Sequence, residues 1–303
     1  MLIATALDTN TNIDRTLDRA HRLRDMGFTR LWSSQIFGPD TLTVLAVVGR
    51  EIPDLDLGTA VVPIHPRHPS MLAAQARTVQ DAIGARLSLG IGLSHRVTVE
   101  GMWGLSYARP VDYMREYLDA LVPMLRGEKV TTNGERVKAT TFAALGPKSV
   151  VTPDLLIAAL GTKMLGLAGS RTNGTLLWLV GHRTISSHIA PTIRAAADQA
   201  GRSEPRIVCS LPIAVTDDVT GARARINESL ALYATLPSYA AMLEKEGATT
   251  PADVGLVGTH DQVLEQLGEL ELAGVTEFSG SPAGNENERD AALAVLLDFR
   301  ASS

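Results

Sequence analysis

The sequence is poor in cysteine and contains no long apolar run. Its single cysteine, Cys209, cannot form an internal disulfide and lies in an apolar, strand-like run, which indicates a reducing compartment. No apolar stretch approaches the roughly 20 residues that a membrane-spanning helix needs. The apolar segment Met1–Leu7 has no basic region and ends at a polar run, so we expect a first strand and not a signal peptide.

The chain also lacks an excess of positive charge. With a formal net charge of −5 it has no dense footprint of lysine and arginine, which argues against non-specific binding of nucleic acids. A length of 303 residues is enough to bury a large core, and it fits one large α/β barrel or two ordinary domains. We therefore expect a globular, cytoplasmic protein that binds neither membrane nor nucleic acid.

Eight apolar, β-rich runs recur along the chain, and amphipathic helical segments separate them. The runs are continuous and not alternating, which is typical of parallel strands buried on both faces. This order predicts a single (β/α)8 TIM barrel over residues 1–303; a doubly wound sheet is the alternative, although it would not predict eight units in series. The predicted strands are Leu2–Leu7, Phe28–Trp32, Leu57–Val62, Arg86–Gly92, Leu155–Leu160, Thr175–Leu179, Arg206–Ile213 and Val275–Ser279.

One segment, around residues 128–153, breaks this rhythm. Val130–Val137 has the pattern of a hairpin, in which Asn133 and Gly134 would supply the positive φ angles of a type I′ turn. Lys138–Thr152 has weak periodicity and is expected to be a loop. Long loops in compact domains are usually functional or mobile, so this inserted segment could cover the mouth of the barrel.

The segment from Asp56 to His95 indicates where a ligand would bind. It has the order strand, Pro/His-rich loop, helix, strand. In parallel α/β proteins the ligand lies beyond the carboxyl ends of the strands. We therefore expect the site at Ala60–His68 and Gly90–His95.

Aromatic residues are scarce, at 4% of the chain, yet all three tryptophans fall at or after predicted strand ends. Trp32 ends the second strand, Trp178 ends the sixth, and Trp103 follows the fourth. Flat apolar side chains there would make a water-excluding wall for a ring and its substrate, with Ser34 and Gln35 as hydrogen-bonding groups. The alternative is that the tryptophans only cap the core of the barrel, which is equally compatible with Trp178.

A glycine-containing turn after the fifth strand predicts an anion site. The glycine would let the backbone approach an anion closely, and free amides at the start of the following helix would point at it. Taken alone, the pattern is better explained by an ordinary capped helix with a surface lysine. A weaker second candidate follows the sixth strand, at Gly181 and Arg183. The residues of the first candidate are Gly161, Thr162, Lys163 and Met164.

The sequence gives little support for a metal site or for a nucleophilic enzyme. His65 and His68 lie three residues apart, but the prolines around them predict an extended loop and not the helix that would hold two imidazoles together. There is no Gly-x-Ser-x-Gly elbow, and no Rossmann glycine pattern follows the first strand. We therefore expect no bound metal.

Four motifs, taken together, resemble one known group of proteins. They lie at Trp32–Phe37, Gly58–Pro69, Gly90–His95 and Ala158–Gly169. They resemble the bacterial luciferase-like superfamily, and more closely its branch of oxidoreductases that use the deazaflavin coenzyme F-420. The resemblance covers nearly the whole chain. It implies a (β/α)8 barrel with inserted segments, a cofactor across the carboxyl face, and a homodimer.

The resemblance also implies roles for particular backbone positions. It implies that the cofactor phosphate lies at Gly161–Met164. It implies a non-prolyl cis peptide between Ala60 and Val61, which backs the cofactor ring. The strand end that carries Gly92 and Ser94 is expected to contact the cofactor as well.

His95 is the candidate catalytic residue. The resemblance places it at the pyrimidine edge of the ring, where a cation or proton donor would stabilise the charge that hydride transfer creates. Some relatives carry a carboxylic acid at this position. A solvated loop histidine is the alternative, and the neighbouring Arg96 could serve instead.

Three functions remain open from the sequence. The first is an oxidoreductase that transfers a hydride between coenzyme F-420 and a small, apolar organic substrate. The second is a monooxygenase that uses oxygen and reduced FMN supplied by a partner reductase. The third is a barrel that binds a cofactor or ligand without catalysis, because fold does not imply function.

Overall fold

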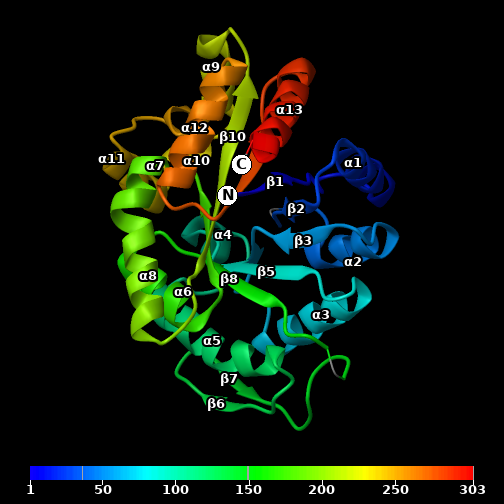
Figure 1. Cartoon of the computed structure of the whole chain (residues 1–303). Coiled ribbons are helices and arrows are strands. Elements are labelled where there is room, and N and C mark those ends of the chain that lie inside the picture. The colour runs from blue at the N-terminus through cyan, green and yellow to red at the C-terminus, as the bar shows by residue number, and fades with distance from the viewer. Residues whose placement is uncertain (36, 149, 303) are drawn as a thin grey trace. The chain divides into compact units, whose positions relative to one another are not determined.

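The computed structural model describes residues 1–35, 37–148 and 150–302 of the chain. These residues form two compact units, and Figure 1 follows the chain through both of them by colour. The first unit contains Met1–Ala6, Arg30–Trp32 and Ala159–Ser303. The second unit contains Leu7–Thr29 and Ser33–Ala158.

The fold is the predicted (β/α)8 barrel. Each of the eight predicted strands is present, and every strand pairing within each unit's main sheet is parallel. Two short strands that the sequence did not predict, β4 (Val62–Pro63) and β11 (Leu256–Gly258), extend this set. The eight strands are β1 (Leu2–Ala6), β2 (Arg30–Ser33), β3 (Asp56–Thr59), β5 (Leu87–Gly92), β8 (Asp154–Ala158), β9 (Gly174–Trp178), β10 (Arg206–Val215) and β12 (Glu277–Pro282).

In the first unit the strand order is β9, β10, β12, β1 and β2, and β11 also pairs with β10. The helices of this unit are α6 (Thr162–Arg171), α7 (His182–Thr184), a π-helix (Ile185–Ile189), α8 (Ala190–Gln199), α9 (Val219–Ser229), α10 (Ala231–Ala234), α11 (Pro237–Glu246), a short 3-10 helix (Pro251–Asp253), α12 (His260–Leu272) and α13 (Glu286–Ser302). The π-helix joins α7 to α8, so these three elements make one continuous helical stretch.

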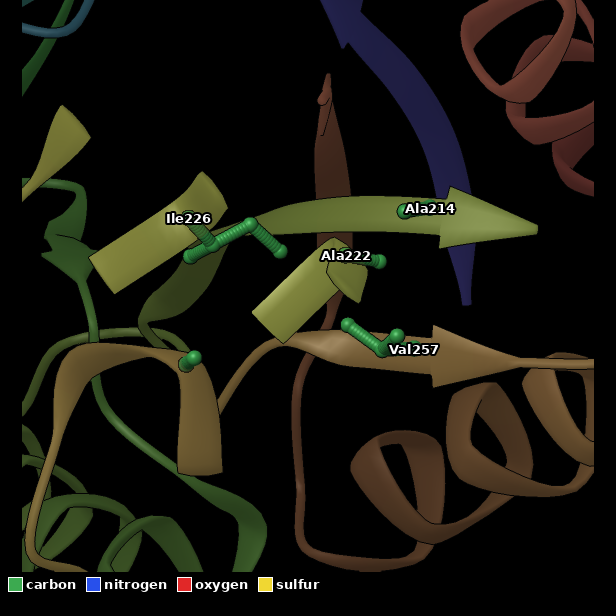
Figure 2. Close-up of a cluster of buried hydrophobic side chains, with 5 residues drawn as sticks. Ala214, Ala222, Ile226 and Val257 are labelled. Carbon is green, nitrogen blue, oxygen red and sulfur yellow. The ribbon is translucent and has the colours of Figure 1, made fainter. Parts of the chain in front are cut away.

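A small apolar cluster fixes α9 against β10 and β11. Ala222 and Ile226 of α9 lie beside Ala214 of β10 and Val257 of β11 (Figure 2). Helix α9 ends at Ser229, because the chain leaves helical geometry at Leu230 (φ −110°, ψ 14°). The Ser229 hydroxyl donates to the Ile226 carbonyl there, which is the local competition that makes serine a helix terminator.

In the second unit β3, β5 and β8 pair in that order, and β4 also pairs with β5. Asn12 caps α1 by accepting from the Arg15 N–H, and Gly27 ends it at φ 112°. The helices are α1 (Ile13–Met26), α2 (Thr41–Glu51), α3 (Pro69–Ala82), α4 (Arg96–Gly101) and α5 (Pro110–Leu125). Across the described ranges, no helix has the length and apolarity needed to cross a bilayer.

The inserted hairpin is present, but its predicted turn is wrong. Strands β6 (Thr131–Asn133) and β7 (Lys138–Thr140) pair Asn133 with Lys138, and the Gly134 N–H donates to the Val137 carbonyl. The connection therefore has four residues. A type I′ turn would need positive φ at both Asn133 and Gly134, and the positive-φ residues in the described ranges include neither.

The rest of the insertion is anchored by a buried arginine. Arg77 of α3 is 3% exposed and donates to the carbonyls of Leu125, Leu145 and Pro147. Leu125 ends α5, and helices of a (β/α)8 barrel run antiparallel to its strands. This part of the insertion therefore lies near the amino ends of the strands and does not cover the mouth, contrary to the sequence-based expectation.

A buried carboxylate holds together three strands of the first unit. Glu277, the first residue of β12, is fully buried and accepts from Arg30 of β2 and Arg206 of β10, each at 2.8 Å. The Trp32 indole N–H donates to its other oxygen. Trp32 is 2% exposed, which argues against its predicted place in a substrate pocket. The side chain reaches back to the amino end of the sheet, which a position in sequence alone does not reveal.

Removing the Glu277 carboxylate should destabilise the protein. Glu277→Ala leaves two guanidinium groups without their buried partner, which typically costs about 3–5 kcal/mol of unfolding free energy. Glu265→Ala, at an exposed position on α12, is the control and should change stability by less than about 0.5 kcal/mol. Urea unfolding at neutral pH measures both values, and equal stabilities of the two variants would contradict the structural role of Glu277.

Candidate functional site

Helix α6, in the first unit, begins without a side-chain cap. Its N-cap is Gly161 (φ −86°, ψ 152°), and no side chain in the described part of the chain bonds to its first turn as a cap. A Cβ at Gly161 would meet no described atom within 4 Å. Thr162 and Lys163 are exposed beside it. Open backbone, first-turn N–H groups that no described side chain caps, a hydroxyl and an ammonium together fit a phosphate.

Met164 contributes to this turn only through its backbone. Its side chain is 8% exposed, so it belongs to the core between α6 and the sheet. The predicted anion-binding residues are therefore together at one helix start. Three of them, Gly161, Thr162 and Lys163, present groups to solvent.

The second candidate anion turn already holds a carboxylate. Glu246, the last residue of α11, accepts from the N–H groups of Arg183 (3.1 Å) and Thr184 (2.7 Å) at the start of α7. A Cβ at Gly181 would lie 2.3 Å from the Glu246 carboxyl carbon. A phosphate could bind these amides only by displacing Glu246, which argues against the predicted role of Gly181 and Arg183. A cavity of about 310 Å³ adjoins this turn.

Trp178 belongs to an aromatic cluster in the first unit. It ends β9, and its ring packs edge-on against Tyr233 of α10 at 6.1 Å, which in turn packs edge-on against Tyr239 of α11 at 5.2 Å. The buried Trp178 indole N–H has no partner among the residues that the structure describes. The sequence missed Tyr233 and Tyr239, because nothing in their local pattern links them to a strand end far earlier in the chain.

In the second unit, the predicted cis peptide bond is present between Ala60 and Val61. The Ala60 N–H donates to the Ser33 carbonyl, and the Gln35 N–H donates to the Val61 carbonyl. A Cβ at Gly92 would lie 2.6 Å from the Val61 side chain, so only glycine fits there. These contacts bring three predicted cofactor-binding residues, Ala60, Val61 and Gly92, together at the ends of the paired strands β3 and β5.

Ser94 and His95 form the turn that follows β5. Ser94 has φ 59°, a left-handed conformation that non-glycine residues rarely adopt and that is common at functional sites. His95 is the N-cap residue of α4 and is half-buried, so it is not the fully solvated loop histidine of the alternative interpretation. Burial lowers the pKa of His95, so its imidazole is mainly neutral at pH 7.

His65 lies in a stack of rings that the sequence did not predict. Its ring is parallel to those of Tyr107 (5.6 Å) and Tyr113 (4.7 Å). Burial lowers the pKa of His65, and a hydrogen bond with the Leu93 backbone partly opposes this. The Tyr107 hydroxyl donates to the Ser94 carbonyl at 3.3 Å. The stack therefore supports the turn that carries His95.

His68 has a separate structural role. Its Nδ1 lies 2.7 Å from the Ser70 hydroxyl at the start of α3, and its Nε2 lies 2.9 Å from the Lys138 carbonyl of the hairpin. His65 and His68 thus do not share a ligand. Within residues 1–35, 37–148 and 150–302, no group of three metal-ligating side chains comes together.

The remaining predicted pocket residues of the second unit differ in their exposure and in the hydrogen bonds that they already make. Ser34 is exposed, and Trp103 is half-exposed just after α4. The Gln35 side-chain oxygen accepts from Arg67 at 2.9 Å, and Arg67 also pairs with Asp40 at 2.6 Å. The Gln35 carbonyl is therefore already engaged, and its amide N–H groups are what it can offer a ligand.

The lowered pKa of His95 predicts a stability change with pH. The unfolded chain takes up this proton at a higher pH than the folded one, so folding stability is retained above about pH 6.5 and falls on acidification below it. His95→Gln should make unfolding free energy less sensitive to pH between 7.5 and 5, measured by urea unfolding.

His260 supplies a control of opposite sign. Hydrogen bonds to Asp298 and Asp261 raise the pKa of His260, so its contribution to stability is present at low pH and lost as the pH rises. His260→Gln should therefore make the acid loss of stability steeper. If His95→Gln had the same effect as His260→Gln, the neutral state of His95 would be contradicted.

Two named relatives are similar to this chain over most of its length. A 5,10-methylenetetrahydromethanopterin reductase of Methanolobus tindarius is 26% identical over 309 residues, covering 91% of this chain and 94% of the relative. A putative coenzyme F-420-dependent oxidoreductase of Mycobacterium tuberculosis is 25% identical over 317 residues, covering 89% and 91%.

Solved structures show the same fold. The coenzyme F-420-dependent tetrahydromethanopterin reductase of Methanopyrus kandleri superposes with a TM-score of 0.81 at 21% identity, over 97% of this chain and 98% of that one. The oxygenating constituent of 3,6-diketocamphane monooxygenase of Pseudomonas putida, solved with FMN, superposes with a TM-score of 0.76 at 16% identity, over 98% and 96%.

The family assignment follows from the sequence itself. The sequence model of the luciferase-like monooxygenases matches residues 2–277. The similar proteins are oxidoreductases and monooxygenases, so the alternative of a non-catalytic barrel is wrong. The chain is an enzyme that belongs to the luciferase-like monooxygenase family.

Proposed function

We propose that the chain is an oxidoreductase that transfers a hydride between coenzyme F-420 and a small, apolar organic substrate. The uncapped start of α6 carries this proposal, because it is a helix N-terminus with open space at Gly161 and exposed donors at Thr162 and Lys163. Two of the similar proteins carry coenzyme F-420 in their names, which favours the deazaflavin over other phosphate-bearing cofactors.

Each unit has residues that fit one part of such a cofactor. Gly161, Thr162 and Lys163 would hold its phosphate through backbone N–H groups, a hydroxyl and an ammonium. Ala60 and Val61, packed on Gly92, would support the ring. When bound, the coenzyme supplies or accepts the hydride, and the protein supplies binding, orientation and electrostatics.

His95 would act as a neutral hydrogen-bond donor and not as a fixed cation. Burial keeps its imidazole mainly unprotonated at pH 7, so it can donate one N–H to a group that gains negative charge. A neutral donor stabilises such charge without strong repulsion when the charge is absent. Its role is therefore to stabilise charge that hydride transfer creates.

The substrate would contact apolar walls and few charges. In the first unit, Trp178 is half-buried at the end of β9. In the second unit, Trp103 is half-buried after α4, and Ser34 together with the Gln35 amide can donate hydrogen bonds. The unpartnered Trp178 indole N–H adds one more donor. This combination suits a small organic molecule with an apolar body and one or two oxygen acceptors. We expect the enzyme to be a homodimer in the cytoplasm.

An FMN-dependent monooxygenase is the second candidate. The similarity to the FMN complex of the Pseudomonas putida protein favours it. The same uncapped turn would hold the FMN phosphate, and a partner reductase would supply the reduced flavin. A deazaflavin has carbon in place of the flavin N5 and reacts poorly with oxygen, so the two candidates differ in their need for oxygen.

Two variants test the assignment of binding and catalysis to separate residues. Lys163→Met should raise the KM for coenzyme F-420 roughly tenfold with little change in kcat, because a charge-assisted hydrogen bond to phosphate is lost. His95→Ala should lower kcat by about a hundredfold or more with little change in coenzyme KM. The assay follows coenzyme absorbance without oxygen against a panel of small ketones, alcohols and enones.

Lys129→Met, at an exposed lysine after α5, is the matched control for the first variant. It should match the wild type in both constants. The F-420 assignment would be contradicted if the wild type turned over no compound of the panel with coenzyme F-420 but consumed oxygen with reduced FMN. That result would favour the FMN-dependent monooxygenase.

A further inference from the structure

A π-turn interrupts the long helix that follows β9. Residues 182–199 run through α7, the π-helix and α8, and the Ala190 N–H donates to the Ile185 carbonyl five residues earlier. Such single π-turns occur frequently at functional sites. Ser186 and Ser187 donate their hydroxyls to the Arg183 carbonyl, and Thr192 donates to the His188 carbonyl. These hydroxyls support the irregular turn from within.

The π-turn presents one polar side chain to the start of α6. Ile185 and Ile189 are fully buried, while His188, between them, is partly buried. His188 Nε2 lies 2.8 Å from the Leu160 carbonyl oxygen. A carbonyl can only accept, so the His188 ring carries its proton on Nε2 and donates it.

This hydrogen bond fixes the direction of the next N–H group. A trans peptide unit is planar, and its C=O and N–H point in opposite directions. The Leu160 carbonyl and the Gly161 N–H belong to the same unit. Holding the carbonyl on His188 therefore aims the Gly161 N–H away from His188. A Cβ at Gly161 would meet no described atom within 4 Å, so the turn also has room for a ligand beside its backbone.

The two helices are also held at a fixed separation. A Cβ at Gly169 of α6 would lie 2.3 Å from the Ile193 carbonyl oxygen of α8, so the two backbones touch. This contact sets the distance over which His188 must reach. The pair of contacts, at Gly169 and at Leu160, therefore determines both the position of α6 and the direction of its first free N–H.

We propose that His188 is a positioning residue for the phosphate-binding turn at Gly161–Lys163. It acts through the Leu160 peptide unit and does not touch the ligand. The inference rests on the proposed function, since it takes the turn to be the phosphate site. It predicts an effect on phosphorylated cofactors alone.

The test compares each cofactor with its own phosphate-free form. Coenzyme F-420 is titrated beside the deazaflavin core without phosphate, and FMN beside riboflavin, with binding followed by ligand fluorescence. His188→Phe keeps a flat ring and removes the donor, so it should weaken binding of the phosphorylated form about tenfold, the equivalent of one hydrogen bond. Binding of the phosphate-free form should stay within about twofold of the wild type.

Two further variants separate positioning from general loosening of the helix. His188→Gln places an amide N–H at a similar reach and should restore most of the phosphate preference. Ser187→Ala removes a hydroxyl that supports the same π-turn without contact to Leu160, and it should keep the wild-type preference. Thermal melts of all variants report stability independently of ligand affinity.

The outcomes distinguish this inference from the cofactor assignment. The positioning role would be overturned if His188→Phe weakened binding of the phosphorylated and the phosphate-free forms equally, or weakened binding of neither. A wild type that prefers FMN overturns the F-420 assignment, while the FMN and riboflavin pair still decides the role of His188. A wild type that prefers neither phosphorylated form overturns the inference together with the phosphate site.

Discussion

The first turn of helix α6 is the constraint on which the functional account depends. Backbone N–H groups at a helix start need partners, and no described side chain caps this turn. At the comparable start of α7, the Glu246 carboxylate fills that role. Of these two helix starts, the start of α6 is therefore the one that an anionic ligand could approach without displacing a carboxylate. The close contact of Gly169 with α8 and the hydrogen bond from His188 hold the available turn in place.

We propose that the second unit supports a flat ring and not a charge. Gly92 leaves room for Val61, and the stack of Tyr107, His65 and Tyr113 supports the turn that carries His95. Burial keeps both histidines mainly neutral at pH 7. The catalytic contribution that we propose for this unit is therefore directional hydrogen bonding in a partly dry setting, which suits a cofactor that carries the reactive chemistry itself.

Local pattern was enough for the strands and for the helix start near Gly161, because hydrophobic runs and helix starts are short-range signals. The phosphate role of that helix start came from the family resemblance. The cis peptide at Ala60 came from the family resemblance alone. Long-range contacts were not accessible: Trp32 reaches a carboxylate 245 residues away, and Glu246 fills a turn more than 60 residues before it. The hairpin turn failed for a different reason, since Asn133 and Gly134 favour a two-residue turn but the pairing of Asn133 with Lys138 requires four.

The most direct measurement is a parallel titration of the purified apo-protein with coenzyme F-420 and with FMN, followed by quenching of tryptophan fluorescence. The account predicts tight binding of the deazaflavin and much weaker binding of FMN. Preferential binding of FMN would contradict it and would move the enzyme to the oxygen-using part of the family. Binding of neither would contradict the phosphate site at α6 itself.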